Sequence, residues 1–151
     1  MATKSKHQNG ETLPGSNGHA PVRAALYARV SSEEQKERQT IQTQVGVAEQ
    51  YSQREGIPLV ATYQDDGVSG TIPFEDREGG RRLLADARAK KFTVVWVYKV
   101  DRLGRADLVT HVARHHLETL GVGIQSLTEP FDTSTPHGRF YVRHLRQFCP
   151  A

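Results

Sequence analysis

The chain has 151 residues, of which 36% are hydrophobic and 25% are charged, and its formal net charge is +3. This length favours one domain with a core of its own, and the small positive charge suits a polyanionic partner without requiring one. The single cysteine, Cys149, excludes an internal disulfide framework and a cysteine cluster for zinc. No apolar run approaches the roughly 20 residues of a membrane-spanning helix. The N-terminus lacks the apolar core of a signal peptide, so we expect a cytoplasmic protein.

Strands and helices are expected to alternate after a polar start. Residues 1–20 contain almost nothing to bury and predict a disordered tail, ahead of a domain at residues 21–137. Apolar runs and helical spacing of apolar residues predict four strands and three helices. The expected strands are Val22–Val30, Leu59–Tyr63, Phe92–Tyr98 and Val122–Leu127, and the expected helices are Thr40–Glu55, Gly80–Ala89 and Ala106–Leu120. We interpret Gln64–Glu78 as a loop and expect a last helix from about Thr135 to Cys149.

This alternation predicts crossover connections, parallel strands and helices on both faces of one sheet. The expected fold is a three-layer α/β/α domain with a mostly parallel sheet of four or five strands. In such sheets ligands bind just outside the carboxyl ends of the strands. Arg29 and Ser31 stand at the end of the first strand, and Lys99–Arg105 follows the third. A serine and several arginines at one edge of a sheet suggest a phosphate site.

Five motifs, in this order and spacing, resemble the catalytic domain of serine recombinases, the family of resolvases, invertases and large phage integrases. The five motifs are Tyr27–Ser31, Gln44, Asp66–Gly70, Arg77 and Asp101–Arg105, and the later stretches Thr128–Thr133 and Gly138–Phe140 also fit. The resemblance extends from about Arg23 to Phe140 and implies a resolvase-like fold. It also implies DNA strand exchange through a covalent 5′-phosphoserine, without a metal or another cofactor.

The resemblance implies a role for each motif residue. Ser31 matches the nucleophile, and Arg29, Arg102 and Arg105 match the groups that bind the scissile phosphate. Arg77 matches a further catalytic arginine on a flexible loop, and the supporting residues are Gln44, Asp66, Ser69 and Asp101. The implied partner is DNA, and full-length members of the family form dimers and tetramers. Neither a membrane nor a small-molecule substrate is expected.

Elementary chemistry agrees with these roles. A phosphodiester under attack gathers negative charge on its non-bridging oxygens, and guanidinium groups answer it with paired hydrogen bonds and a permanent charge. Without a metal, several arginines must share this task. A serine hydroxyl needs activation, and no histidine occupies a motif position. We therefore expect arginines to lower the pKa of the hydroxyl or to pass its proton.

Each assignment also has a structural alternative. Ser31 and Glu34 fit the spacing of a helix capping box. Arg102 and Arg105, three positions apart, fit one solvated helix face. Asp65-Asp66-Gly67 is typical of a turn. The joint occurrence of these residues at two strand ends and in the loop between them favours the catalytic interpretation.

Two further clusters carry weaker signals. His111, His115 and His116 lie close together, but no acid or other ligand completes a zinc site, so we interpret them as surface histidines. The second cluster is a group of basic residues that fits a solvated face and a DNA-binding groove equally well. Its members are Arg81, Arg82, Arg88, Lys90 and Lys91.

The last residues depart from the family pattern. Relatives continue past the position of Gly138 into a long helix with an alanine-glutamate-arginine region and then into a DNA-binding domain. We therefore interpret residues 138–151 as the truncated start of that helix, and we expect this chain alone to fold but not to recombine DNA. Two functions remain open: the catalytic domain of a site-specific DNA recombinase, and an idle remnant that acts as an interaction module for intact recombinase subunits. A nucleotide-binding domain is a weaker alternative, because no glycine-rich fingerprint follows a strand.

Overall fold

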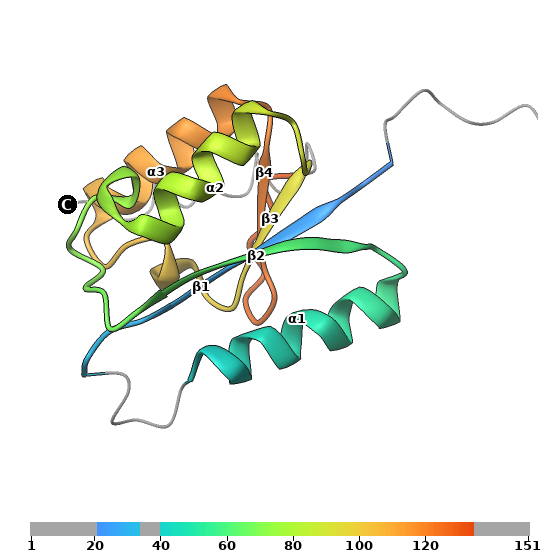
Figure 1. Cartoon of the computed structure of the whole chain (residues 1–151), viewed down its shortest axis with the longest axis horizontal. Coiled ribbons are helices and arrows are strands. Elements are labelled where there is room, and N and C mark those ends of the chain that lie inside the picture. The colour runs from blue at the N-terminus through green and yellow to red at the C-terminus, as the bar shows by residue number, and fades with distance from the viewer. Residues whose placement is uncertain (1–20, 34–39, 135–151) are drawn as a thin grey trace, which may run out of the picture.

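The computed structural model describes residues 21–33 and 40–134, and their fold is the α/β arrangement expected from the sequence. One parallel sheet has the strand order β2-β1-β3-β4. The strands are β1 (Ala24–Val30), β2 (Leu59–Asp66), β3 (Val94–Val97) and β4 (Gly123–Ser126). Helix α1 (Ile41–Glu55) covers one face of the sheet, and α2 (Glu78–Arg88) and α3 (Asp107–Thr119) cover the other (Figure 1). Within the described ranges, no helix is long and apolar enough to cross a membrane.

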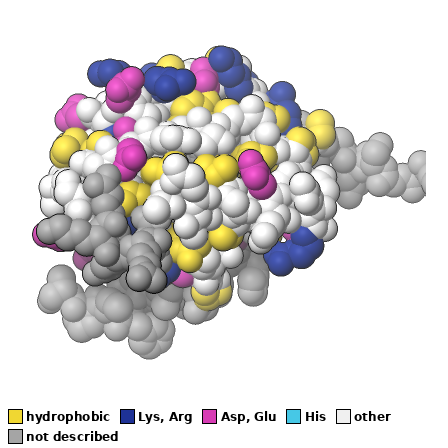
Figure 2. Space-filling view, turned by 60° about the horizontal axis from the view of Figure 1, so that its bottom comes forward, with side chains coloured by type: hydrophobic (Ala, Val, Ile, Leu, Met, Phe, Trp, Pro, Cys, Tyr) yellow, Lys and Arg dark blue, Asp and Glu magenta, His cyan; other side chains and the backbone are white. Residues whose placement is uncertain are grey.

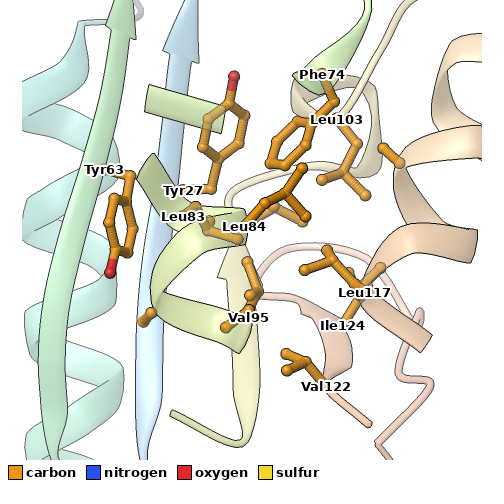
Figure 3. Packing of buried hydrophobic residues seen from close by; sticks show 14 of the residues in the cluster. Tyr27, Tyr63, Phe74, Leu83, Leu84, Val95, Leu103, Leu117, Val122 and Ile124 are labelled. Atoms are coloured by element: carbon orange, nitrogen blue, oxygen red, sulfur yellow. The ribbon is translucent and has the colours of Figure 1, made fainter. Parts of the chain in front are cut away.

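The core lies on both faces of β1, which is buried along its whole length. Successive side chains of a strand point to opposite faces, so Leu26 packs with Trp96 on the α1 side. Tyr27 belongs to the larger cluster under α2 and α3, which includes Leu83 and Leu117 (Figure 3). A central strand with two buried faces has little freedom to shift, which makes its carboxyl end a rigid support.

The parallel register brings the carboxyl ends of the strands to one edge. Val30 at the end of β1 pairs with Asp66 at the end of β2. Beyond this pair, the backbone N–H groups of Gly67 and Val68 donate to the carbonyl of Val30 at 2.7 and 3.1 Å. The segments that follow β1, β2 and β3 therefore meet at this edge.

Several boundaries differ from the sequence prediction. Strand β3 is shorter than the expected Phe92–Tyr98, because it pairs with its neighbours only over Val94–Val97. The segment Gln64–Glu78, expected as a loop, contains the end of β2, the 3₁₀ helix η2 (Phe74–Asp76) and the first residue of α2. The strand is longer than expected because its pairing with β1 continues as far as Asp66. The expected tail and the expected last helix lie outside the described residues.

The helix boundaries reflect their caps. Thr40 caps α1, because its Oγ1 accepts a hydrogen bond from the N–H of Thr43 at 3.2 Å, and Gly56 ends α1 with a φ of 66°. Helix α2 starts two residues earlier than expected. The carboxylate of Asp65, distant in sequence, accepts from the N–H groups of Gly79 and Gly80 at 2.8 and 3.1 Å and takes the place of a local cap.

The contact between η2 and α2 leads to a prediction about two helical glycines. A Cβ atom on Gly80 would lie 2.1 Å from the carbonyl oxygen of Phe74. Gly80→Ala must therefore displace η2 or α2, and we expect it to lower the free energy of unfolding by roughly 2 kcal/mol. In α1 an added Cβ on Gly46 meets no atom within 4 Å, so Gly46→Ala should raise stability by about 0.5–1 kcal/mol. Urea denaturation measures both, and an unchanged midpoint for Gly80→Ala would contradict the close packing.

Candidate active site

Ser31 is the first residue after β1, and its side chain is almost completely buried. Nη2 of Arg105 lies 3.4 Å from the Ser31 hydroxyl oxygen. It reaches the hydroxyl from the short segment between η3 (Val100–Arg102) and α3. A cation at this distance stabilises negative charge that develops on the oxygen. Helix α1 is capped by Thr40, and Glu34, the partner that a capping box at Ser31 requires, lies outside the described residues.

Arg29 is completely buried and connects three segments at the sheet edge. Its Nη1 donates to the carbonyl of Val68 at 3.0 Å, in the loop after β2. Its Nη2 and Nε donate to the carbonyls of Asp101 and Arg102 at 2.9 and 3.1 Å, in η3. Carbonyl oxygens carry no net charge, so these three bonds hold the guanidinium in place without neutralising it.

The backbone of Arg29 is held by Gln44 from α1, a residue that is itself buried. The Gln44 Oε1 accepts from the N–H of Arg29 at 3.3 Å, and its Nε2 donates to the Arg29 carbonyl at 3.0 Å. Pairing between β1 and β3 ends at Tyr27. Beyond that point the Gln44 amide supplies the donor and the acceptor that a neighbouring strand would supply.

Arg77 lies between η2 and α2, and its side chain is buried. The expectation that it stands on a flexible loop is therefore corrected. Its guanidinium donates to the carbonyls of Ile72, Gly70 and Arg102, at 2.9, 3.3 and 3.2 Å. Arg77 therefore binds the loop after β2 to η3, and it shares the Arg102 carbonyl with Arg29. This burial was not predictable from the charged residues around Arg77 in the sequence.

Arg102 and Arg105 have different environments, which contradicts the alternative of one solvated helix face. The side chain of Arg102 is 4% exposed and that of Arg105 is 41% exposed. Arg102 Nη1 donates to the Arg29 carbonyl at 3.3 Å, and its Nε forms an ion pair with Asp101 Oδ1 at 3.4 Å. Arg105 forms an ion pair with Glu33, whose side chain is 82% exposed, at 3.3 Å. A solvated pair of this kind contributes little stability and is readily exchanged for another anion.

Asp66 and Ser69 lie in the same region, at the end of β2 and in the loop that follows it. Asp66 ends β2 with its side chain exposed. The Ser69 Oγ lies 2.8 Å from Thr71 Oγ1 and accepts from the Thr71 N–H at 3.2 Å, so Ser69 shapes its own turn. At Gly70, an added Cβ would lie 2.8 Å from Cγ of Arg105. A glycine at this position lets the loop pack against the arginine that contacts Ser31.

Two residues without a role in the sequence interpretation join this cluster. The Tyr27 hydroxyl donates to Asp65 Oδ2 at 2.8 Å and accepts from Arg77 Nη1 at 3.0 Å. Burial raises the pKa of Tyr27 well above its usual range and outweighs the opposite effect of the Arg77 charge. Asp65 was assigned only to a turn. The signal that points to it is alternation along β2, because Tyr63 and Asp65 are buried while Gln64 and Asp66 are exposed.

The charged side chains of the site are arginines and a few carboxylates. No group of three or more His, Cys, Asp or Glu side chains is placed to hold a metal ion in the part of the chain that the structure describes. Figure 2 shows few Lys and Arg side chains over the α1 face. The basic residues of α2 and the turn after it, Arg81, Arg82, Arg88, Lys90 and Lys91, are all exposed, which agrees with both interpretations of them.

Known proteins that are similar to this chain include serine recombinases and DNA invertases. The family model described as "Resolvase, N terminal domain" matches residues 24–148. The chain is 40% identical over 79 residues to the serine recombinase Gin of Escherichia phage Mu, a match that covers 51% of this chain and 38% of Gin. It is 38% identical over 79 residues to the DNA-invertase Hin of Salmonella typhimurium, with the same two coverages of 51% and 38%. The matched part thus spans less than half the length of these relatives.

Solved structures give the same result for the fold. The N-terminal catalytic domain of TP901-1 integrase superposes with a TM-score of 0.72 at 30% identity, covering 83% of this chain and 92% of that one. The C-terminal catalytic domain of ISC1926 TnpA, an IS607-like serine recombinase, superposes with a TM-score of 0.60 at 26% identity, covering 84% and 80%. The expected fold class is therefore confirmed.

The Gln44 side chain provides a test of how the site is held together. Gln44→Ala leaves the buried N–H of Arg29 without its acceptor, and we expect the free energy of unfolding to fall by roughly 2 kcal/mol. Gln42 is exposed on the same helix, so Gln42→Ala should change stability by less than about 0.5 kcal/mol. Urea denaturation of the two variants measures the difference. Equal stabilities would show that Gln44 is dispensable for the backbone of Arg29.

Proposed function

The chain belongs to the resolvase family of serine recombinases, matched by that family's N-terminal domain, and from this membership we propose that it is the catalytic domain of a site-specific DNA recombinase. The observation that supports the proposal is the contact between Ser31 and Arg105 at the edge of a cluster of buried arginines. The proposed partner is DNA and the proposed location is the cytoplasm, and assembly into dimers and tetramers belongs to the same proposal.

The proposed reaction is a reversible phosphoryl transfer. The Ser31 oxygen attacks the phosphorus of a DNA phosphodiester, the bond from phosphorus to the 3′ oxygen breaks, and the 5′ end remains attached to the serine. The serine gives up its proton and the 3′ oxygen takes one up, so proton and charge balance. Rejoining is the same step in reverse, with a 3′ hydroxyl from the exchanged strand as the nucleophile.

The arginines divide this work according to their exposure. Arg105 is the most accessible of them and already contacts the Ser31 oxygen, so we assign it to the phosphate and to the developing charge on the serine. Arg29 and Arg102 contribute positive charge from fixed positions beneath it, and we assign them to the phosphate as well. Arg77 is proposed as a further catalytic arginine, and the supporting residues proposed are Gln44, Asp66, Ser69 and Asp101.

An idle remnant that only binds recombinase subunits is not favoured. Such a remnant has no use for a serine, an exposed arginine and three buried arginines at one edge of a sheet. The arrangement costs stability in its own right, because each buried guanidinium must be taken out of water. The proximity of these groups argues for catalysis.

Ser31→Ala should abolish the covalent protein–DNA adduct, because it removes the nucleophilic oxygen. Since the match covers only 38% of Gin, the assay uses a chimera in which this domain replaces the matching domain of Gin and acts on the DNA site of Gin. The adduct is detected by a denaturing gel after a detergent quench. Ser32, the exposed neighbour, provides the control, and Ser32→Ala should retain the adduct. Peptide mapping of the DNA link to Ser32 would refute the assignment.

Arg105→Lys should slow adduct formation on the order of 100- to 1,000-fold, because an ammonium cannot reproduce the planar fork of a guanidinium. Its side chain is partly exposed, so the free energy of unfolding should change by less than about 0.5 kcal/mol. Arg102→Lys, at a buried position, should lower both the rate and the stability. Single-turnover kinetics in the chimera and urea denaturation separate the two effects. A normal rate in Arg105→Lys would exclude a direct role at the phosphate.

A further inference from the structure

The buried carboxylate of Asp65 has no part in the reaction described above, although only Tyr27 separates it from Arg77. We propose that Asp65, acting through Tyr27, is a positioning residue that orients Arg77 in the active site. The inference rests on the proposed function only for the role of Arg77 in the reaction; the orientation itself is a property of the free chain.

Three donors converge on the Asp65 carboxylate. Its Oδ1 accepts from the N–H of Gly79 at 2.8 Å, and its Oδ2 accepts from the N–H of Gly80 at 3.1 Å and from the Tyr27 hydroxyl at 2.8 Å. A Cβ on Gly79 would lie 2.8 Å from Oδ2, so the close approach depends on glycine. The start of α2 thus fixes both oxygens of the carboxylate.

The donor and acceptor of each hydrogen bond in the series Asp65–Tyr27–Arg77 follow from the chemistry of the three groups. An ionised carboxylate only accepts and a guanidinium only donates. The hydroxyl of Tyr27 must therefore donate to Asp65 and present a lone pair to Nη1 of Arg77. The raised pKa of Tyr27 keeps the proton on the hydroxyl. Arg77 consequently receives an acceptor at one fixed position.

The Tyr27 hydroxyl affects other active-site residues because Arg77 also contacts them. The same Nη1 that meets Tyr27 at 3.0 Å also donates to the carbonyl of Arg102 at 3.2 Å, and that carbonyl accepts from Nε of Arg29 at 3.1 Å. A change in the orientation of Arg77 therefore alters a contact of Arg29. The Asp65 carboxylate also balances the charge of a guanidinium that is almost completely buried.

The chain contains a matched control for this interaction. Tyr63 pairs with Tyr27 in the register of β1 and β2, belongs to the same core cluster, and donates its hydroxyl to Asp86 Oδ2 at 2.6 Å. In Figure 3 the two hydroxyls point toward opposite ends of the strands, so only that of Tyr27 faces the site. Tyr63→Phe removes a tyrosine–aspartate hydrogen bond between the same sheet and α2, and it leaves the contacts of Arg77 unchanged.

The first experiment compares Tyr27→Phe, Asp65→Asn and Tyr63→Phe in the full chain, using the Nε–Hε signals of the arginines in nitrogen-15 NMR. In Tyr27→Phe the signals of Arg77 and Arg29 should shift, and exchange of the Arg77 Hε with solvent should accelerate about tenfold or more. Tyr63→Phe should leave both signals in place. Unchanged signals in Tyr27→Phe, or equal changes in Tyr63→Phe, would overturn the inference. Tyr27→Phe preserves the ring, so it remains decisive if Asp65→Asn does not fold.

The second experiment measures adduct formation in the Gin chimera. Tyr27→Phe should slow the reaction about tenfold, and Tyr63→Phe should react normally. Moved arginine signals with an unchanged rate would show that the orientation of Arg77 does not matter for the reaction. If the parent chimera forms no adduct, the proposed function fails, and the NMR comparison still decides whether Asp65 orients Arg77.

Discussion

The carbonyl oxygen of Arg102 accepts hydrogen bonds from two buried guanidinium groups, those of Arg29 and Arg77. A guanidinium that leaves water must find acceptors for its donors, because each unpaired donor raises the cost of burial. Here the acceptors are backbone carbonyls of the loop after β2 and of η3. The conformations of these two segments are therefore tied to the arginines, and neither segment can move without leaving a buried charge poorly solvated.

The sheet makes this arrangement possible because its central strand continues farther than one of its neighbours. Pairing between β1 and β3 ends at Tyr27, whereas pairing between β1 and β2 reaches Val30. The last residues of β1 thus have an open side, where the side chains of Gln44 and Arg102 supply hydrogen bonds in place of a strand. Ser31 follows immediately, so the nucleophile proposed here is fixed by the register of the sheet rather than by its own loop.

The sequence was sufficient to predict the alternating elements and most of the residues that meet at the sheet edge. Burial periodicity specifies strands and helices locally, and a family resemblance adds the site. The burial of Arg77 and Arg102 was beyond such reasoning, because charged residues are usually exposed and their acceptors are carbonyls that any residue type supplies. Asp65 was missed for a related reason. Its donors on Gly79 and Gly80 come from a helix whose start it determines itself.

The difference between the inner and outer arginines has a consequence for how an anion enters. The guanidinium groups of Arg29 and Arg77 donate to backbone carbonyls that fix their positions. Arg105 instead forms an ion pair with Glu33, an exposed carboxylate, and in the proposed reaction a phosphate takes its place at little cost. In the proposed reaction the phosphate then meets donors that are already oriented, which is the condition under which electrostatic stabilisation of a transition state is most effective.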